Sequence, residues 1–259
     1  MRRRESVAVR ERNSAMVKRI KKVKADHPFW GYRRIWAHLK YVDGLNVNRK
    51  RVLRLMQKQG LVVKPDTRLK AVRTPQKNKP KPTRPREWWG IDMTKVMVEG
   101  FGWMYIVAVL DWYTKKIVGY YAGIQCRSCH WLEALNDAVN REFPEGVKER
   151  ELSLMSDNGS QPTSVAFMKA CREMGIKQAF TSYGNPKGNA DTERVFRTMK
   201  EELLWLREWH SPFELTDSLG IWVESYNKLY LHSSLGYKSP MKFEEEYQQN
   251  NQLTLLVTP

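Results

Sequence analysis

A chain of 259 residues, 41% of them hydrophobic, is long enough to bury a sizeable core and to form one large domain with a smaller one. No stretch approaches the roughly 20 apolar residues that cross a bilayer, and no apolar segment follows the charged N-terminus. We therefore expect a soluble cytoplasmic protein without membrane contact. Three cysteines are too few for a disulfide framework in a chain of this size.

The net charge of +17 is divided unevenly along the chain. Residues 1–86 hold 27 lysines and arginines against 5 aspartates and glutamates, a net charge of +22, whereas residues 87–259 hold 18 against 23, a net charge of −5. A basic segment of this density is typical of phosphate binding, and spaced carboxylates suit divalent cations. A solvated basic tail is the alternative, which the apolar pattern within the segment disfavours.

The basic region has the apolar spacing of three helices. The first is expected at residues 15–24 and the second at residues 31–40, and the third follows a cap at Asn46 or Asn48. A tight turn before a very basic last helix predicts a helix-turn-helix domain over residues 1–62, with a small helical bundle as the alternative. The residues expected to contact DNA are Arg33, Arg34, Arg49, Lys50, Arg51 and Arg54.

A proline-rich basic linker over residues 63–86 precedes an α/β domain over residues 87–259 that ends in a helical segment. Three antiparallel strands followed by alternating strands and helices are the element order of an RNase H-like fold, a mixed sheet flanked by helices. The strands are expected at residues 88–98, 102–111, 116–123, 152–155 and 176–180. The helices are expected at residues 131–141, 164–173, 190–208 and 215–230.

Three acidic residues lie where these elements are expected to converge. Asp92 interrupts a strongly strand-forming run, and Asp157 follows a strand at the carboxyl end, where α/β sheets present ligand-binding residues. Glu193 comes after Asp157 with 35 residues between them, on a helix that begins after a polar, glycine-rich loop at residues 182–189 expected to be mobile. Because grouped carboxylates repel one another, three together predict bound cations.

The predicted cations are two Mg²⁺ ions, for which Mn²⁺ is an expected substitute, held by Asp92, Asp157 and Glu193. Two such ions about 3.5 to 4 Å apart activate an attacking water or 3′-hydroxyl and stabilise the leaving oxygen during displacement at phosphorus. The same three residues are therefore the predicted catalytic residues. Arg197 and Lys200 lie one and two turns further along the same helix face and are expected to hold DNA phosphate.

Three other features are interpreted more simply. Cys126 to His130 reads Cys-Arg-Ser-Cys-His, the pattern of covalent haem attachment, but no second cysteine pair or export signal accompanies it, so it is interpreted as incidental at a helix start. Asp111 lies between two strands, where a role in the hairpin turn is expected. His232 is interpreted as a weak DNA contact.

Several motifs occur in a fixed order along the chain. They are Trp30 to Ile35, Asn48 to Met56, Trp89 to Thr94, Ser156 to Gln161, Gly184 to Lys200, Tyr226-Asn227 and His232 to Pro240. Together they resemble the motifs of insertion-sequence transposases with a retroviral integrase-like core, and specifically of the catalytic product of the second reading frame. The resemblance spans nearly the whole chain.

This resemblance implies a DDE-type enzyme that binds the ends of its element and catalyses metal-dependent DNA cleavage and strand transfer. It implies double-stranded DNA as the partner, at element ends and target, and a location on the bacterial nucleoid. Because paired ends must be held together, a homo-oligomer on DNA is expected. An upstream reading frame is expected to supply a partner or, through frameshifting, a fused segment.

Two departures from the family pattern stand out. Gly188 occupies a position where the family usually has aspartate, and Asp191 adds an acid two residues before Glu193. Glu193 remains the predicted third ligand, because Asp191 faces elsewhere on a helix. In the last motif, Tyr230 and Leu231 stand where arginines are common, so contacts to the terminal strand are expected to differ.

Two other functions fit parts of the pattern. A catalytically silent DNA-binding regulator with the same fold predicts DNA binding without magnesium and no cleavage under any condition. A ribonuclease acting on RNA–DNA hybrids shares the carboxylate chemistry but leaves the helix-turn-helix unexplained.

Overall fold

The computed structural model describes residues 7–63, 80–181 and 188–257 and divides the chain into two compact units, Met1–Arg73 and Thr74–Pro259. Most of the predicted linker and most of the loop predicted to be mobile lie outside the described residues. Within the described ranges, no helix is both long enough and apolar enough to span a bilayer.

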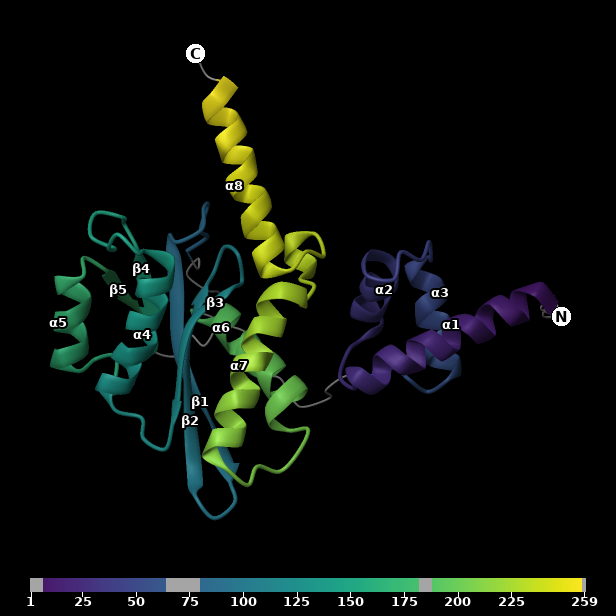
Figure 1. Cartoon of the computed structure of the whole chain (residues 1–259), viewed down its shortest axis with the longest axis horizontal. Coiled ribbons are helices and arrows are strands. Elements are labelled where there is room, and N and C mark those ends of the chain that lie inside the picture. Colours follow the sequence, from purple (N-terminus) through teal and green to yellow (C-terminus); the bar gives the residue numbers. More distant parts are fainter. Residues whose placement is uncertain (1–6, 64–79, 182–187, 258–259) are drawn as a thin grey trace, which may run out of the picture. The chain divides into compact units, whose positions relative to one another are not determined.

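The N-terminal unit consists of three helices, α1 (Val7–Asp26), α2 (Tyr32–Tyr41) and α3 (Arg49–Lys58) (Figure 1). Their shared core contains buried side chains from all three helices, among them Ile20, Ile35, Leu39, Val52 and Met56. The prediction for the first helix, residues 15–24, was too short. The apolar stripe predicts only the part that packs, whereas the helix also includes the preceding residues 7–14, which contain no glycine or proline.

Polar contacts fix the approach to α3. Asn48 caps this helix, as predicted, and its side chain accepts a hydrogen bond from the backbone N–H of Lys50 at 2.8 Å. The Trp36 indole N–H donates to the carbonyl of Val47 at 2.8 Å, which ties α2 to the segment that leads into α3. The turn between α2 and α3 is therefore held from both sides.

The C-terminal unit is built on a five-stranded sheet with the order β3-β2-β1-β4-β5. The strands β1, β2 and β3 pair antiparallel, whereas β4 pairs parallel with β1 and β5 parallel with β4. Each predicted strand is present to within one residue at either end. Their bounds are β1 (Trp88–Val98), β2 (Gly102–Asp111), β3 (Ile117–Gly123), β4 (Ser153–Ser156) and β5 (Lys177–Phe180).

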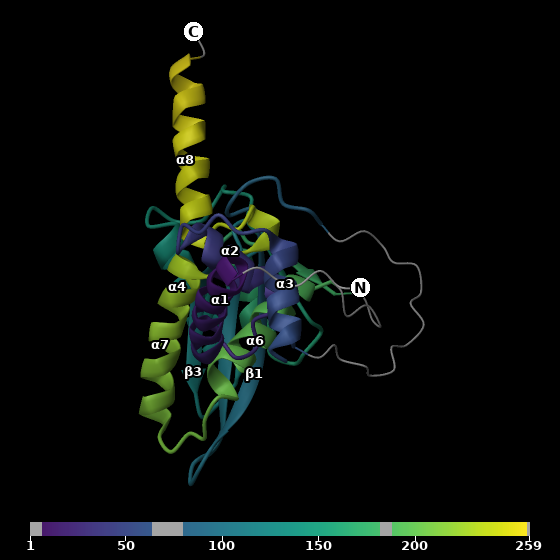
Figure 2. The same cartoon turned by 90° about the vertical axis from the view of Figure 1, so that its right-hand side faces the viewer.

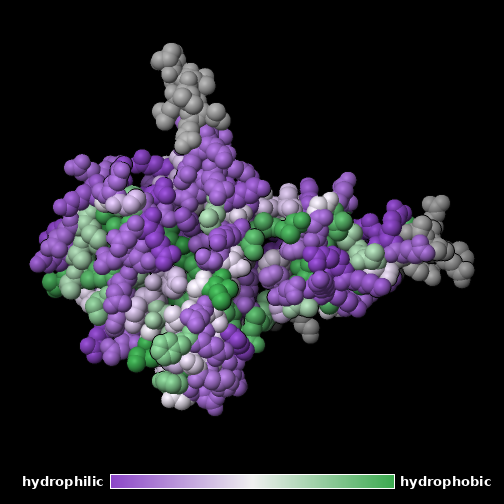
Figure 3. Space-filling view, viewed as in Figure 1, coloured by the Kyte–Doolittle hydropathy of each residue, from purple (hydrophilic) through white to green (hydrophobic). Residues whose placement is uncertain are grey.

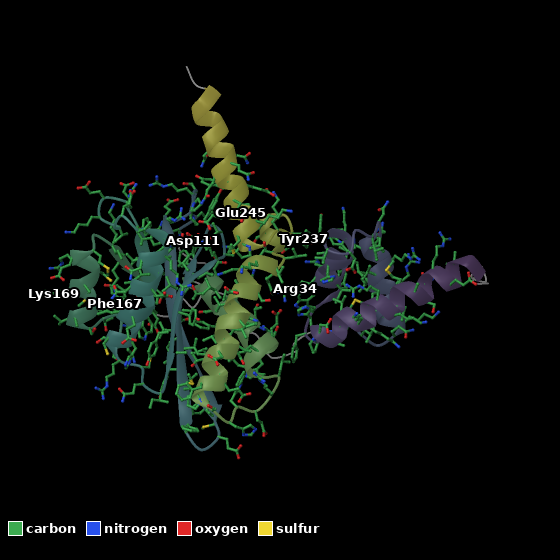
Figure 4. The ribbon with its side chains drawn as sticks, in the orientation of Figure 1. Arg34, Asp111, Phe167, Lys169, Tyr237 and Glu245 are labelled. Atoms are coloured by element: carbon green, nitrogen blue, oxygen red, sulfur yellow. The ribbon has the colours of Figure 1, made fainter. Side chains whose placement is uncertain are left out.

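Helices cover both faces of this sheet (Figure 1). On one face α4 (Ser128–Glu142) and α5 (Val165–Glu173) bury a cluster that includes Trp89, Trp131 and Phe167, the last of which is labelled in Figure 4. On the other face α6 (Ala190–Met199) and α7 (Pro212–Leu229) bury a second cluster that includes Phe196 and Trp222. In Figure 2, α7 runs along the length of the strands. Alternate residues of β1 belong to opposite clusters, as its period of two requires.

The prediction of a single helix over residues 190–208 is correct only as far as Met199, where the α-helix ends. It continues from α6 as a π-helix, η1 (Lys200–Leu204), whose widened turn is closed by the backbone N–H of Trp205 donating to the carbonyl of Lys200 at 2.9 Å. After α7 come a short 3-10 turn, η2 (Ser233–Leu235), and α8 (Pro240–Val257), the helical segment expected at the C-terminus. The face of α8 seen in Figure 3 is hydrophilic as far as its coloured residues extend.

Two buried glutamates and two half-buried cations join the start of α8 to the core. Glu142 and Glu244 are only 8% and 6% exposed, and each pairs with both Arg86 and Lys116. The four N···O distances lie between 2.6 and 3.1 Å. Because each buried carboxylate meets two cations, both acids are compensated where water is excluded.

Candidate active site

Asp92 and Asp157 are neighbours across the parallel pair β1 and β4. The two strands pair Trp89 with Leu154 and Gly90 with Met155, so continuing this register by two residues on each strand brings Asp92 opposite Asp157. Asp157 follows the last residue of β4, and its carboxylate accepts the backbone N–H of Gly159 at 3.0 Å. The predicted placement of these two acids at one end of the parallel pair is thus what the backbone provides.

The first turn of α6 lies on the same face of β1 as Asp92. Gly90, two residues before Asp92, would place a Cβ atom only 2.2 Å from Oγ1 of Thr192 and 2.6 Å from Oδ1 of Asn189. Residues two apart on a strand face the same side, so Asp92 points toward the layer that contains α6. Glu193 lies in this first turn, directly after Thr192, and is exposed.

The electrostatics of Asp92 show which charges surround it. Burial raises the pKa of Asp92 from its ordinary value of 3.8 to about 6, the N–H of Met93 opposes this rise, and the nearby charges of Asp157 and Glu193 add to it. Lys200 acts in the opposite sense and lowers the same pKa. The two other predicted acids and the predicted phosphate-binding lysine therefore all act on Asp92.

The three predicted carboxylates are not close enough together in this structure to enclose a cation. Among the described residues, no three histidine, cysteine, aspartate or glutamate side chains are close enough to hold one metal ion. The donor set itself suits a hard divalent cation, since it consists of carboxylate oxygens with no nitrogen or sulfur ligand among them. Asp157 and Glu193 are exposed, so their side chains can change rotamer without disturbing the core.

Three charged residues near Glu193 differ in how they are engaged. Asp191 forms an ion pair with Lys115 at 3.1 Å, so this extra acid already has a cationic partner. Arg197 is exposed and pairs with Glu201 at 2.9 Å along the helix. Lys200 is half-buried at the point where α6 gives way to the π-helix. Of these three residues, Lys200 is the one whose positive charge lowers the pKa of Asp92.

Asp111 has the turn role predicted for it and lies inside the core (Figure 4). One carboxylate oxygen accepts the backbone N–H groups of Tyr113 and Thr114, at 2.8 and 2.9 Å. The other accepts the N–H of Arg86 at 2.6 Å and the indole N–H of Trp89 at 3.2 Å. Burial raises the pKa of Asp111, which these backbone donors counteract.

The structure also shows the surroundings of His232 and of the Cys-Arg-Ser-Cys-His motif. His232 packs against the rings of Tyr226 and Tyr230, with centroids 5.4 and 4.8 Å away, so its interpretation as a DNA contact stays a prediction. The Cys-Arg-Ser-Cys-His motif does occur at a helix start, since α4 begins at Ser128, and all three cysteines of the chain are free.

The six basic residues predicted to contact DNA differ in their exposure to solvent. Arg33, Arg49, Lys50 and Arg54 are exposed, whereas Arg34, labelled in Figure 4, and Arg51 are half-buried. Arg51 donates to the side-chain oxygen of Asn13 at 2.8 Å and so links α3 to α1. A cavity of about 710 Å³ between these helices is lined by Asn13, Arg51, Arg54 and Lys58, among others. Sequence reasoning missed Asn13, whose role depends on tertiary packing.

This chain is similar to known proteins along most of its length. Two family models described as "Integrase core domain" match residues 82–186 and 174–240, and one described as "HTH-like domain" matches residues 11–68. The transposase for insertion sequence element IS904 of Lactococcus lactis is 30% identical over 214 residues, covering 78% of this chain and 82% of that protein. The transposase for element IS629 of Shigella sonnei is 28% identical, covering 92% and 81%.

A solved structure shares the fold. A chain of the simian T-cell lymphotropic virus intasome, solved in complex with PP2A regulatory subunit B56 gamma, superposes with a TM-score of 0.52. It covers 87% of this chain and 74% of the viral chain at 13% identity. At this identity the likeness is one of fold alone.

Proposed function

Because this chain belongs to the insertion-sequence transposases, DDE-type enzymes that move DNA by strand cleavage and strand transfer, we propose that Asp92, Asp157 and Glu193 are its catalytic carboxylates. The predicted fold class, an RNase H-like integrase core with an N-terminal helix-turn-helix-like domain, is confirmed. The observation that carries the proposal is geometric: the register of β1 and β4 leads Asp157 to the half-buried Asp92, and the first turn of α6, which contains Glu193, lies against β1 at Gly90.

The proposed ligands of two Mg²⁺ ions are the same three carboxylates, with Mn²⁺ as a substitute. When bound, such a pair of cations activates the attacking oxygen and stabilises the leaving oxygen at phosphorus. The protein supplies the rest. Asp92 provides a fixed carboxylate on a central strand, Asp157 and Glu193 adjust beside it, and Lys200 offsets part of their negative charge.

DNA binding is assigned to the basic residues of the N-terminal unit, Arg33, Arg34, Arg49, Lys50, Arg51 and Arg54, with Arg197 and Lys200 close to the acids. The proposed DNA is double-stranded, at the element ends and at the target. The domain limits proposed from sequence are residues 1–62 for DNA binding, 63–86 for the linker and 87–259 for the core. The proposed location is the cytoplasm, on the nucleoid.

Paired element ends require at least two copies of this chain, each with its own set of three acids. A segment encoded by an upstream reading frame is proposed either as a separate partner or as a part fused to this chain. The mass of the protein bound to paired ends tests the first point. A monomer bound to both ends would contradict it.

The deciding experiment compares Glu193→Gln with Asp191→Asn, two substitutions that each remove one charge from the first turn of α6. Labelled terminal DNA of the element is incubated with the purified protein and any upstream partner in Mg²⁺. Loss of outer-shell groups around a metal typically costs about 10- to 100-fold, so loss of a direct ligand should reduce nicking and strand transfer by about 100-fold or more. Asp191→Asn, whose partner is Lys115, should stay within about 10-fold of wild type.

Equal activity of wild type and Glu193→Gln would remove Glu193 from the mechanism. Tight binding of the DNA by wild type, with no cleavage under any condition, would assign this chain a regulatory role within the family. Cleavage of a labelled RNA–DNA hybrid in place of duplex ends would favour the ribonuclease.

A further inference from the structure

We propose that Asn189 is a positioning residue for the reaction: with Gly90 and Thr192 it holds the first turn of α6 against β1 and so fixes where Glu193 stands relative to Asp92. This inference rests on the proposed function, since it concerns the placement of a proposed catalytic carboxylate.

A direct hydrogen bond joins Asn189 to the strand that carries Asp92. The side-chain N–H of Asn189 donates at 3.2 Å to the carbonyl of Ile91, the residue adjacent to Asp92. The backbone of the same residue continues into the helix, since the N–H of Glu193 donates to the carbonyl of Asn189 at 3.1 Å. Asn189 therefore bonds through its side chain to the neighbour of one acid and through its backbone to the other acid.

Gly90 is what allows the helix to come this close. The position of a Cβ atom on Gly90 would lie 2.2 Å from Oγ1 of Thr192, 2.4 Å from the indole nitrogen of Trp112 and 2.6 Å from Oδ1 of Asn189. The indole of Trp112 donates to Thr192 at 3.4 Å, closing the group from the side of β2. A glycine inside a strand often marks such a close approach, which is the one sequence signal that points to this contact.

The residue before Asn189 approaches the strand end on the Asp157 side. A Cβ atom on Gly188 would lie 2.5 Å from Cγ2 of Thr181 and 3.4 Å from its Cα. Thr181 in turn donates its N–H to the carbonyl of Ser156 and accepts the side-chain N–H of Asn158, at 2.9 and 2.6 Å. The start of α6 therefore packs closely against Thr181, which is hydrogen-bonded to the residues on either side of Asp157.

The side chain of Asn189 does not make the contacts expected of a residue that only stabilises the fold. It is 3% exposed, and among the described residues its Oδ1 atom has no hydrogen-bond donor. A buried acceptor left unsatisfied is destabilising. Asn227 shows the fully satisfied alternative in the same unit: it ties α7 to β3 by accepting the N–H of Ile117 and donating to the carbonyl of Ile117, both at 2.9 Å.

Asn227 therefore supplies a matched control for the experiment. The full-length variants Asn189→Ala and Asn227→Ala each lose one buried amide that ties a helix to a strand, but only the first lies beside the acids. Three quantities are measured for each: the Mg²⁺ concentration for half of the Mg²⁺-induced rise in Tm without DNA, the binding of terminal DNA, and the rate of strand transfer.

Both variants should lose thermal stability. Only Asn189→Ala should need about 10-fold more Mg²⁺ for half of the Tm rise and transfer strands at least about 10-fold more slowly, with DNA binding within about twofold of wild type. A Mg²⁺ response and a rate equal to those of Asn227→Ala would overturn the inference.

Two further variants make the outcome decisive. If Asn189→Ala does not fold, Thr192→Val, which keeps the side-chain shape and removes the hydroxyl near Trp112, should show the same changes to a smaller degree. If it too matches Asn227→Ala, the inference fails. Glu193→Gln is measured in parallel, because activity in that variant would overturn the proposed function itself, whereas its inactivity beside a normal Asn189→Ala would overturn only the positioning role.

Discussion

Asp92 lies on a sheet face that is otherwise packed with apolar side chains from α6 and α7. Its carboxylate accepts one short backbone hydrogen bond, from Met93 at 2.8 Å, and faces the like charges of Asp157 and Glu193. The ionised side chain is therefore held in a place that favours its protonated form until a cation arrives. The sequence showed that an acid interrupts the strand, but the size of this effect depends on burial that only the fold creates.

This arrangement predicts a pH-dependent stability in the absence of divalent cations. The pKa of Asp92 is raised to about 6, above the ordinary value of 3.8 that applies in the unfolded chain. The native state thus holds a proton between about pH 4 and 6 that the unfolded state releases, so the contribution of Asp92 to stability falls as the pH rises through this window. Above it, the ionised carboxylate destabilises the fold.

Asp92→Asn should therefore raise the Tm at pH 7.5 in chelator by roughly 2 to 6 °C, allowing about 1 to 2 kcal/mol for a carboxylate that is partly exposed. It should also remove the rise in Tm that protonation of Asp92 is expected to cause in wild type between pH 6.5 and 4. Thermal melts across this range measure both effects, with Asp217→Asn, at an exposed site on α7, as the control. A lower Tm for Asp92→Asn at pH 7.5 would contradict the assignment.

At the scale of elements, the apolar residues of β1 to β4 identified these strands, whereas β5 has two polar residues, Lys177 and Gln178, and was found from the apolar residues on either side of them, Ile176 before and Ala179-Phe180 after. Periodicity failed at the ends of helices. The residues after Met199 favour an α-helix, so the local sequence does not predict the π-helix at Lys200–Leu204 or the turn that ends it. Contacts such as Asn189 with Ile91 join residues far apart in the chain, and so no short motif contains them.

The packing of α4 on β3 depends on Gly119. A Cβ atom there would lie 2.5 Å from the backbone nitrogen of Ala138 and 2.6 Å from the carbonyl oxygen of Ala134, atoms that cannot move without the helix. Gly119→Ala should therefore lower the free energy of unfolding of the core by about 1 to 3 kcal/mol. Urea denaturation measures this.

Gly31→Ala is the control for Gly119→Ala. Gly31 precedes α2 with an ordinary φ of −76°, and no atom lies within 4 Å of its added Cβ. The free energy of unfolding of the Gly31→Ala variant should differ from that of wild type by no more than about 0.5 kcal/mol. A loss at Gly119 as small as this would mean that α4 can shift away from the sheet.

On the scale of the whole molecule, charge separates binding from chemistry. Residues 87–259 carry −5 and hold the acids, so they repel phosphate unless cations are present, whereas residues 1–86 carry +22. Most of the affinity for DNA must therefore come from the basic part. This division was predictable from composition, since net charge needs no knowledge of the fold.

The salt dependence of DNA binding should resolve this basic surface residue by residue. Arg54 is exposed, and its replacement by glutamine should reduce the slope of log Kd against log salt by about one without changing the Tm. Arg51→Gln should also lower the Tm, because Arg51 holds Asn13. Fluorescence anisotropy at several salt concentrations gives the slopes. An unchanged slope for Arg54→Gln would remove Arg54 from the DNA surface.

The four charges at Arg86, Lys116, Glu142 and Glu244 limit how such a chain can diverge over evolutionary time. Loss of Arg86 or Lys116 leaves two buried carboxylates with one cation to share, which costs up to about 3 to 5 kcal/mol, whereas exchange of the whole set for apolar side chains is often neutral or stabilising. Single steps between these two states cross an unstable intermediate. Lineages should therefore keep all four charges or none, and these positions, distant in sequence, should be inherited as one character.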